Sequence, residues 1–378
     1  MLEILLTASV SFIISFLAIP VVLQIADQKK LFDVPDERKV HAHAVASLGG
    51  VGIFGGFLLS SLLSIQIGYF NPEFQYFFAA ALVIFFLGLK DDLVVLSASK
   101  KFVGQMVATS MLVHMGGIRI DSMHGLFGVY ELPEAFSYAL SYLTIIVVIN
   151  SFNLIDGIDG LAASLGTLTM LVFGTYFFIA GYQAYALVAY ALAGSLVAFL
   201  IFNHHPAKIF MGDSGSLLIG LINAILVIKF INIATDPTVA LPLSSAVAIG
   251  FSILIVPLLD TLRVFAIRIA NGRSPFTPDR NHVHHLLLTW GFGHTGVTFI
   301  CLGLNIAFIM LAYFGRSLGS TYLILTMLAI SFAGFGILYY RRPRRTLVIA
   351  KSINGAVELK TSSKVVTLTQ EAATADQQ

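Results

Sequence analysis

The sequence predicts an all-α polytopic membrane protein of about eleven transmembrane helices, with its N-terminus outside and its C-terminus in the cytoplasm. Of the 378 residues, 57% are hydrophobic and only 11% are charged, whereas soluble domains usually carry about 25% charged residues. The mean hydropathy is +0.88, and apolar residues recur in runs of roughly 18–22, the length of a membrane-spanning helix. Lysine and arginine are divided unequally between alternate loops, which indicates the orientation.

The first apolar run is predicted to be a transmembrane helix and not a cleavable signal, because its only early charge is Glu3 and no small-residue cleavage site follows it. The single cysteine, Cys301, lies in another apolar run, so an intrachain disulfide is excluded. In chain order, the predicted spans are 4–25, 47–67, 74–90, 102–116, 135–150, 160–181, 183–202, 214–234, 241–262, 297–315 and 320–340.

The positive charges predict which loops are cytoplasmic. One set of alternate loops holds sixteen Lys and Arg residues, whereas the other set holds three, namely Arg119, Lys229 and Arg316. Because positively charged loops stay in the cytoplasm, the richer set is predicted to lie there. The net charge of +2 does not indicate a nucleic-acid partner, and none is expected. The sequence leaves open whether the protein forms a homodimer.

Two segments differ from this pattern of spans and short loops. Residues 116–133 alternate in polarity and contain glycines, so they form either a small periplasmic β-hairpin or a plain connector. We expect an integral membrane domain over 1–345 and a polar cytoplasmic tail over 346–378. The tail can hold a short strand near the letters TLVIA, and its last ten residues are expected to be disordered.

Four polar clusters lie where predicted helices meet the cytoplasm. The first, GLKDDLVVLSASKKFVGQ (88–105), places the adjacent acids Asp91 and Asp92 at one helix end and Lys100 and Lys101 at the next. The lysines alone suit a membrane boundary equally well. Two paired carboxylates, however, repel each other unless a cation or a shared proton intervenes, which favours a functional site.

The second cluster, NSFNLIDGIDGLA (150–162), stands between two long apolar runs. On a helix, Asn153, Asp156 and Asp159 follow one another at three-residue steps, so they share about a third of the circumference. A polar loop with helix N-caps explains any one of them. It does not explain the whole row, because unpaired polar groups are costly away from water.

The third cluster, FNHHPAKIFMGDSGSLLIG (202–220), ends one helix at Pro206 and starts the next near Asp213. Asp213 suits a helix N-cap. It equally suits a hard divalent metal, which prefers carboxylate and amide oxygens. Asn203 and Lys208 lie in the same loop, within reach of an anionic ligand.

The fourth cluster is the loop over 258–293, which is rich in arginine and histidine. Zinc is not favoured there, because no cysteine lies nearby and no His-Glu-x-x-His pattern occurs. A cytoplasmic loop explains the arginines, although the planar guanidinium of Arg280 also suits phosphate oxygens. A cytoplasmic loop does not explain the histidines, which are better explained as side chains that bind phosphate or sugar hydroxyls. They are His282, His284 and His285.

Together the clusters supply acids for a divalent cation, bases for phosphates, and a position that faces both cytoplasm and lipid. These are the parts of Mg²⁺-dependent phosphoryl transfer, in which positioning and charge neutralisation provide most of the catalysis. A site at a membrane face predicts one lipid reactant and one soluble, phosphorylated donor.

The chain resembles the polyprenyl-phosphate N-acetylhexosamine-1-phosphate transferase family (glycosyltransferase family 4), and within it the undecaprenyl-phosphate N-acetylglucosaminyl-1-phosphate transferase branch. The resemblance covers about residues 30–290. It implies transfer of a sugar 1-phosphate from a UDP-N-acetylhexosamine to undecaprenyl phosphate in a bacterial inner membrane, with release of UMP, as the first lipid-linked step of a cell-envelope polysaccharide such as O-antigen or teichoic acid. Its carriers are DVPDERKVHAHAVASLGG (33–50), GLKDD (88–92), NSFNLIDGIDGLA (150–162), IFMGDSGS (209–216) and PDRNHVHH (278–285).

The resemblance also implies roles for single residues. Asp213 and Asn153 would hold Mg²⁺, or Mn²⁺, against the pyrophosphate of the donor, with Asp156 nearby as a further catalytic acid. Asp91 and Asp92 would face the lipid phosphate, and Asp91 would orient or deprotonate it for attack on the β-phosphorus. The sequence leaves open whether this attack is direct or proceeds through a covalent aspartyl-phosphate intermediate. The substrate-binding residues would be Asp159 and Asn203 for the nucleotide, Lys101 and Arg280 for phosphates, and His282, His284 and His285 for the sugar-phosphate end.

One motif departs from the family's pattern. The aspartate-rich motif is often written Asp-Asp-x-x-Asp, but its third acid is replaced here by Val95, so an active chain does not need that acid. The form PDRNHVHH is closer to the N-acetylglucosamine branch than to the cell-wall translocase, which favours UDP-N-acetylglucosamine as the donor.

Two other classes of membrane protein compete with a transferase. Secondary transporters also carry membrane-embedded acids, but they place them near the bilayer midplane on broken helices, whereas these acids crowd at predicted cytoplasmic ends. An intramembrane aspartyl protease with a Gly-x-Gly-Asp motif is disfavoured, because Phe210 stands at the position of its first glycine.

Overall fold

The computed structural model describes residues 1–33, 45–65, 72–270, 272, 282–341, 348–351, 357–361 and 364–368. The chain divides into two compact units, Met1–Gly334 and Phe335–Gln378. The first unit is a bundle of helices with two short β-ribbons, and it contains three of the four polar clusters together with the described part of the fourth. The described strands of the second unit form a three-stranded sheet.

The helices follow the apolar runs of the sequence. In chain order they are α1 (Leu2–Lys29), α2 (Gly49–Ser64), α3 (Glu73–Leu93), α4 (Ala98–Ser110), α5 (Glu134–Ile155), α6 (Leu161–Ile179), α7 (Gln183–Asn203), α8 (Gly212–Ala234), α9 (Ala246–Ile253), α10 (Ile255–Ala270), α11 (Val283–Thr289), α12 (His294–Phe314) and α13 (Ser320–Tyr340). Each predicted span coincides with a helix, except that 241–262 falls on the two helices α9 and α10. A π-helical turn over Met111–Met115 extends α4.

Seven of the described helices are long and apolar enough to cross a membrane, or eight if α9 and α10 form one span that is bent by 81°. The chain is therefore a polytopic membrane protein. The number eleven stays a prediction, because α3 is not among the seven and α2 with 16 residues and α4 with 13 are shorter than the roughly 20 residues of a full span. The orientation also stays a prediction. The seven helices are α1, α5, α6, α7, α8, α12 and α13.

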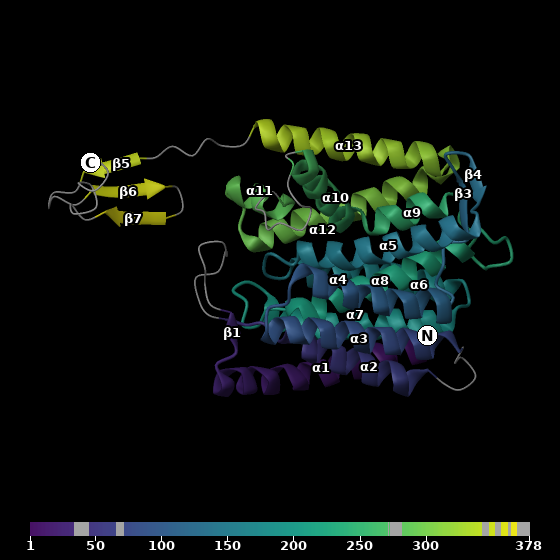
Figure 1. Cartoon of the computed structure of the whole chain (residues 1–378), viewed down its shortest axis with the longest axis horizontal. Coiled ribbons are helices and arrows are strands. Elements are labelled where there is room, and N and C mark those ends of the chain that lie inside the picture. The colour runs from purple at the N-terminus through teal and green to yellow at the C-terminus, as the bar shows by residue number, and fades with distance from the viewer. Residues whose placement is uncertain are drawn as a thin grey trace. The chain divides into compact units, whose positions relative to one another are not determined.

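The described strands form small antiparallel units. In the first unit, β1 (Phe32–Asp33) pairs with β2 (Val45–Ala46), and β3 (Ser122–Leu126) pairs with β4 (Val129–Glu131). The second pair shows that, of the two forms expected for 116–133, the segment takes the hairpin and not the plain connector. It lies at the opposite end of the helices from β1 (Figure 1).

The second unit consists of more strands than the sequence predicted. Its sheet has the order β5–β6–β7, with β5 (Val348–Lys351), β6 (Val357–Thr361) and β7 (Lys364–Leu368). β5 falls on the predicted TLVIA strand, whereas β6 and β7 were not predicted. The last ten residues, predicted to be disordered, lie outside the described residues.

The break between α9 and α10 is compensated by Asn305 of α12. A broken helix leaves backbone groups without their usual partners. The Asn305 side-chain nitrogen donates to the Ile253 carbonyl at 3.0 Å, and its oxygen accepts from the Val256 N–H at 3.3 Å. Asn305 is fully buried. Its two hydrogen bonds therefore satisfy backbone groups on both sides of the break, in a place that offers them little water.

Helix α8 forms the buried centre of the first unit. It is apolar around its whole circumference, which is typical of a fully buried helix, and it packs against α2, α3 and α5 among others. Small residues let the backbones approach closely. A Cβ atom on Gly50 of α2 would lie 2.3 Å from the Gly215 nitrogen, and one on Gly88 of α3 would lie 2.5 Å from the Ser214 Cα.

The N-terminus of α8 is capped by a side chain from another helix. Met211, the residue before α8, makes no side-chain cap. Instead, Asp92 at the end of α3 accepts hydrogen bonds from the Asp213 N–H at 2.6 Å and the Ser214 N–H at 3.1 Å, and from the Ser214 hydroxyl at 2.6 Å. These N–H groups would otherwise be unsatisfied. Asp92 therefore joins the end of α3 to the start of α8.

The close approach of α2 to α8 gives a first prediction. The substitution Gly50→Ala is expected to lower the free energy of unfolding by about 1–3 kcal/mol, because the added methyl group meets backbone and not a flexible side chain. Gly55→Ala on the same helix is the matched control, since nothing lies within 4 Å of its Cβ position. Thermal unfolding in detergent, followed through the single tryptophan Trp290, measures both. Equal unfolding temperatures for the two variants would contradict the packing described.

A second prediction concerns the cap on α8. Asp92→Ala is expected to lower the free energy of unfolding by about 1–2 kcal/mol, because backbone donors of α8 lose their acceptor. Asp92→Asn keeps one accepting oxygen and should lose less. The same unfolding measurement ranks wild type, Asn and Ala in that order. Unfolding of Asp92→Ala at the wild-type temperature would show that the cap contributes nothing.

Candidate active site

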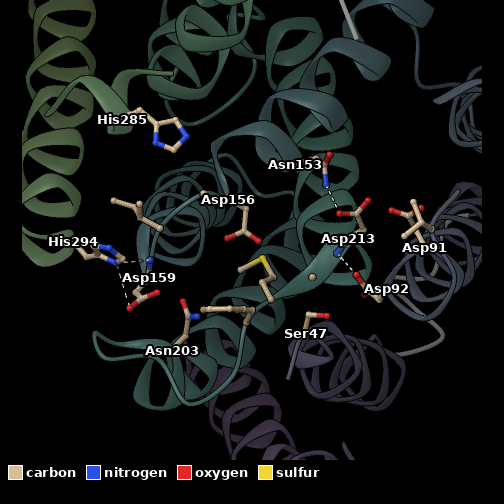
Figure 2. A pocket seen from close by; sticks show the side chains of 16 residues that line it. Ser47, Asp91, Asp92, Asn153, Asp156, Asp159, Asn203, Asp213, His285 and His294 are labelled. Carbon is tan, nitrogen blue, oxygen red and sulfur yellow. Dashed lines mark hydrogen bonds and ion pairs between the residues drawn. The ribbon is translucent and has the colours of Figure 1, made fainter. Parts of the chain in front are cut away.

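A cavity of about 490 Å³ opens where the polar ends of several helices meet. Figure 2 labels side chains around it from the ends of α3, α5 and α7, the turn after α5, the starts of α8 and α12, helix α11 and the segment after β2. The residues that line it are Ser47, Asp91, Asp92, Val95, Asn153, Asp156, Gly157, Ile158, Asp159, Asn203, Phe210, Met211, Gly212, Asp213, His285 and His294.

Most of the residues predicted for the site meet in this cavity. Three predicted residues, Lys101, His282 and His284, are described but do not line it, and Arg280 lies outside the described residues. The predicted residues that line it are Asp91, Asp92, Asn153, Asp156, Asp159, Asn203, Asp213 and His285. Residues from four separate sequence clusters are therefore neighbours in space.

One end of the cavity is a network of acids around Lys101. The Lys101 ammonium lies 2.5 Å from Asp213 Oδ2 and also forms an ion pair with Asp91. The Asn153 amide nitrogen donates to Asp213 Oδ1 at 2.9 Å. The Leu96 N–H donates to the other oxygen of Asp91 at 2.5 Å. Lys101 thus neutralises part of the negative charge from behind the cavity wall.

Asp156 lies in the middle of the cavity. It follows the last residue of α5, and no hydrogen bond or ion pair joins its carboxyl group to another described residue. Burial raises the pKa of Asp156 to about 8, and the negative charges of Asp213, Asp92 and Asp159 add to this rise. At neutral pH this group therefore requires a bound proton or a nearby cation.

Asp159, three residues further on, has the opposite environment. Its Oδ2 atom accepts from His205 Nδ1 at 2.6 Å and from the Ala207 N–H at 3.2 Å, and it lies 3.3 Å from His294 Nδ1. Burial alone would raise the pKa of Asp159, but the hydrogen bonds from His294 and His205 outweigh it and lower the pKa to about 2. This carboxylate is therefore ionised at neutral pH.

Asn203 contributes to the site mainly by holding the backbone in place. Its side-chain oxygen accepts from the Gly160 N–H at 2.9 Å, and its nitrogen donates to the Ile209 carbonyl at 2.8 Å. Gly160 has a left-handed φ of 77°, which glycine adopts without strain. Asn203 thereby joins the turn after α5 to the segment before α8.

The structure divides the three histidines of the fourth cluster. Only His285 lines the cavity. His284 is buried against Gly157, and its pKa is lowered to about 3 by burial and then by the charge of His285, so it is neutral. His282 is buried as well, and its Nδ1 atom lies 2.7 Å from Asp260 of α10, which also accepts from the Val283 N–H at 2.7 Å.

Two residues of the cavity wall with side chains able to bind a ligand, Ser47 and His294, were not predicted. Ser47 follows β2 and lies within the first of the five motifs, where no residue was singled out. Its carbonyl oxygen would lie 2.4 Å from a Cβ on Gly212, so it borders the start of α8. His294 is the first residue of α12 and stands alone in the sequence, with no pattern to indicate a site.

The end of the cavity with Asp213 can hold a divalent metal. The carboxylates of Asp213 and Asp156 face the cavity with the amide group of Asn153, and oxygen ligands of this kind suit Mg²⁺. The charge of Asp156, which no described residue pairs with, fits the same conclusion, because a metal would neutralise it. In the structure the Asn153 nitrogen faces Asp213; a flip of the amide group would bring its oxygen to this side as a ligand.

Comparison with known proteins identifies the family. The sequence model of glycosyl transferase family 4 matches residues 74–231, which contain the acid-rich wall of the cavity. The decaprenyl-phosphate N-acetylglucosaminephosphotransferase of Mycobacterium tuberculosis is 34% identical over 330 residues, or 79% of each chain.

Two further relatives show the same similarity. The probable undecaprenyl-phosphate N-acetylglucosaminyl 1-phosphate transferase of Bacillus subtilis is 33% identical over 294 residues, covering 75% of this chain and 78% of the relative. The undecaprenyl-phosphate alpha-N-acetylglucosaminyl 1-phosphate transferase of Escherichia coli (strain K12) is 29% identical over 297 residues, covering 76% of this chain and 78% of the relative. The chain belongs to glycosyl transferase family 4, the family of polyprenyl-phosphate N-acetylhexosamine-1-phosphate transferases that its five motifs resemble.

Proposed function

We propose that this protein transfers N-acetylglucosamine 1-phosphate from UDP-N-acetylglucosamine to undecaprenyl phosphate, forming undecaprenyl-diphospho-N-acetylglucosamine and UMP. The names of the relatives support this reaction, because each describes N-acetylglucosamine phosphate transfer to a polyprenyl phosphate. The product would begin a lipid-linked polysaccharide of the bacterial cell envelope.

The observation that carries the proposal is the cavity at the polar ends of apolar helices, with acids from three helix ends and Lys101 behind them. A lipid phosphate and a nucleotide diphosphate bring several negative charges into one place. Phosphoryl transfer requires that those charges be held and neutralised. The cavity provides oxygen ligands for a metal at one end, from Asp213, Asp156 and Asn153.

A divalent cation, Mg²⁺ or Mn²⁺, fits the end of the cavity formed by Asp213 and Asn153, with Asp156 beside them. When bound there it would neutralise charge on the pyrophosphate of the donor. Asp92 holds the start of α8, and thereby fixes the Asp213 backbone. Asn153 and Lys101 then contact the Asp213 carboxylate, so its position is determined from three sides.

The proposed reaction exchanges one phosphoanhydride bond for another. An oxygen of the lipid phosphate attacks the β-phosphorus of the donor, a new P–O bond forms, and the bond to the α-phosphate breaks and releases UMP. A phosphate monoester loses its second proton at a pKa of about 6, so the acceptor is largely a dianion at neutral pH. Asp91 then has no proton to remove from most acceptor molecules, and its role is to orient Lys101 and the acceptor phosphate.

We place the cavity at the cytoplasmic face of the inner membrane. Sixteen of the Lys and Arg residues assigned to loops fall on that side, against three on the other. A soluble nucleotide sugar is accessible only from the cytoplasm. An ion-coupled transporter, the main alternative, would release no UMP, so a product assay separates the two functions.

The third prediction tests the reaction and its metal. Purified protein with undecaprenyl phosphate and UDP-N-acetylglucosamine is expected to release UMP and form a lipid diphospho-sugar, identified by mass spectrometry. EDTA should abolish both products and added Mg²⁺ should restore them, because the acids then lose and regain their counter-charge. Decaprenyl phosphate and other UDP-sugars, assayed in parallel, define the acceptor and donor. UMP release that persists in EDTA would refute the role of a metal.

The fourth prediction separates Asp91 and Asp213 from exposed acids. Asp213→Asn and Asp91→Asn are each expected to lower kcat by about 10²–10³-fold, the usual loss when a charged group at a reacting centre is removed. Asp27→Asn is the matched control, because Asp27 is exposed at the end of α1 and does not line the cavity. Unfolding temperatures must match wild type for the comparison to hold. Near-normal kcat in a folded Asp91→Asn would remove Asp91 from the reaction.

A further inference from the structure

A second group of side chains able to hold a metal lies at the end of the cavity away from Asp213; Asp159 and His294 line the cavity, and His205 lies beside them. Asp159 lies in the turn between α5 and α6, His205 in the loop between α7 and α8, and His294 at the start of α12. One ligand atom from each lies within 4.8 Å of the others. Figure 2 shows Asp159 and His294 on the opposite side of Asp156 from Asp213.

We propose that Asp159, His205 and His294 form a separate binding site for Zn²⁺ or a similar borderline divalent cation. Two imidazole nitrogens and one carboxylate oxygen, with a water molecule as the fourth ligand, are a typical set for such an ion. This set differs from the oxygen ligands around Asp213, which suit a hard cation. The proposal does not depend on the transferase reaction.

One of the separations between these ligand atoms already matches a tetrahedral site, and a second needs a small movement. Ligand atoms bound to one zinc ion lie roughly 3.3 Å apart. His294 Nδ1 lies 3.3 Å from Asp159 Oδ2, which matches that separation. His205 Nδ1 lies 2.6 Å from the same oxygen, so it must move away by roughly 0.7 Å to admit the ion. His205 is half-exposed on a loop, where such a movement meets little packing.

The nitrogen of His294 that faces Asp159 has a lone pair on that side, because it also accepts a hydrogen bond from the Asp159 N–H at 3.4 Å. Two imidazoles turn their Nδ1 atoms toward one carboxylate oxygen, and their rings lie 4.5 Å apart between centroids. A single histidine would satisfy that oxygen together with the Ala207 N–H. Asp159 is only 9% exposed, and His294 13%. A largely buried carboxylate with two converging imidazole nitrogens is a pre-arranged ligand set.

The test uses the full-length protein in detergent, stripped of metals and then kept in excess Mg²⁺. Co²⁺ is the spectroscopic probe, since its tetrahedral complexes absorb visible light strongly and its octahedral complexes absorb weakly. Wild type is expected to develop the strong tetrahedral bands and to lose them when Zn²⁺ displaces the Co²⁺. Absence of these bands in wild type would overturn the proposal without any variant.

Three variants and one control assign the ligands. Asp159→Asn, His205→Ala and His294→Ala are each expected to abolish the bands and to bind about one Zn²⁺ fewer per chain in competition with a chromophoric chelator. His204→Ala is the matched control, because His204 is an exposed neighbour whose Nδ1 faces the His205 carbonyl. Trp290 fluorescence and elution volume verify folding. Bands that persist in all three folded variants would place the Co²⁺ elsewhere and refute the site.

Discussion

The start of α8 is the point on which the rest of the site depends. Gly50 and Gly88 let α2 and α3 approach its backbone, and the Asp92 carboxylate accepts from its first free N–H groups. The position of Asp213 follows from these contacts. The positive end of the α8 dipole is thereby directed at the cavity, where it favours negative charge. Close helix packing and the electric field of the helix dipole thus act together at the N-terminus of α8.

Two carboxyl groups of the cavity differ in how many hydrogen-bond partners they have, and this difference determines their protonation. Asp156 and Asp159 differ by three positions in one turn, yet the first has no partner among the described residues and the second has three. Their pKa values therefore move in opposite directions. His205, in the loop before α8, and His294, at the start of α12, cause this difference. Segments that carry no acid therefore set the pKa values of the acids.

Much of this structure could be predicted from the sequence, for identifiable reasons. Long apolar runs predict helices because a spanning backbone must satisfy its own hydrogen bonds, and the alternating segment before α5 predicts the β3–β4 hairpin. Clusters such as Asp91 with Asp92 were visible because charge is rare in this chain. The roles of Asp92 and Asn203 were not predictable, since each bonds to backbone far away in sequence. His294 is a lone histidine that only tertiary packing brings to Asp159.

The break between α9 and α10 affects the site from a distance. Since Asn305 satisfies backbone groups on both sides of the break, α10 can change direction by 81° without leaving them unpaired. The redirected helix carries Asp260, which anchors His282 and the first N–H of α11. The same short segment continues to His285 in the cavity wall. The Asn305 amide on α12, although it does not line the cavity, thus helps to determine where His285 lies in the cavity wall.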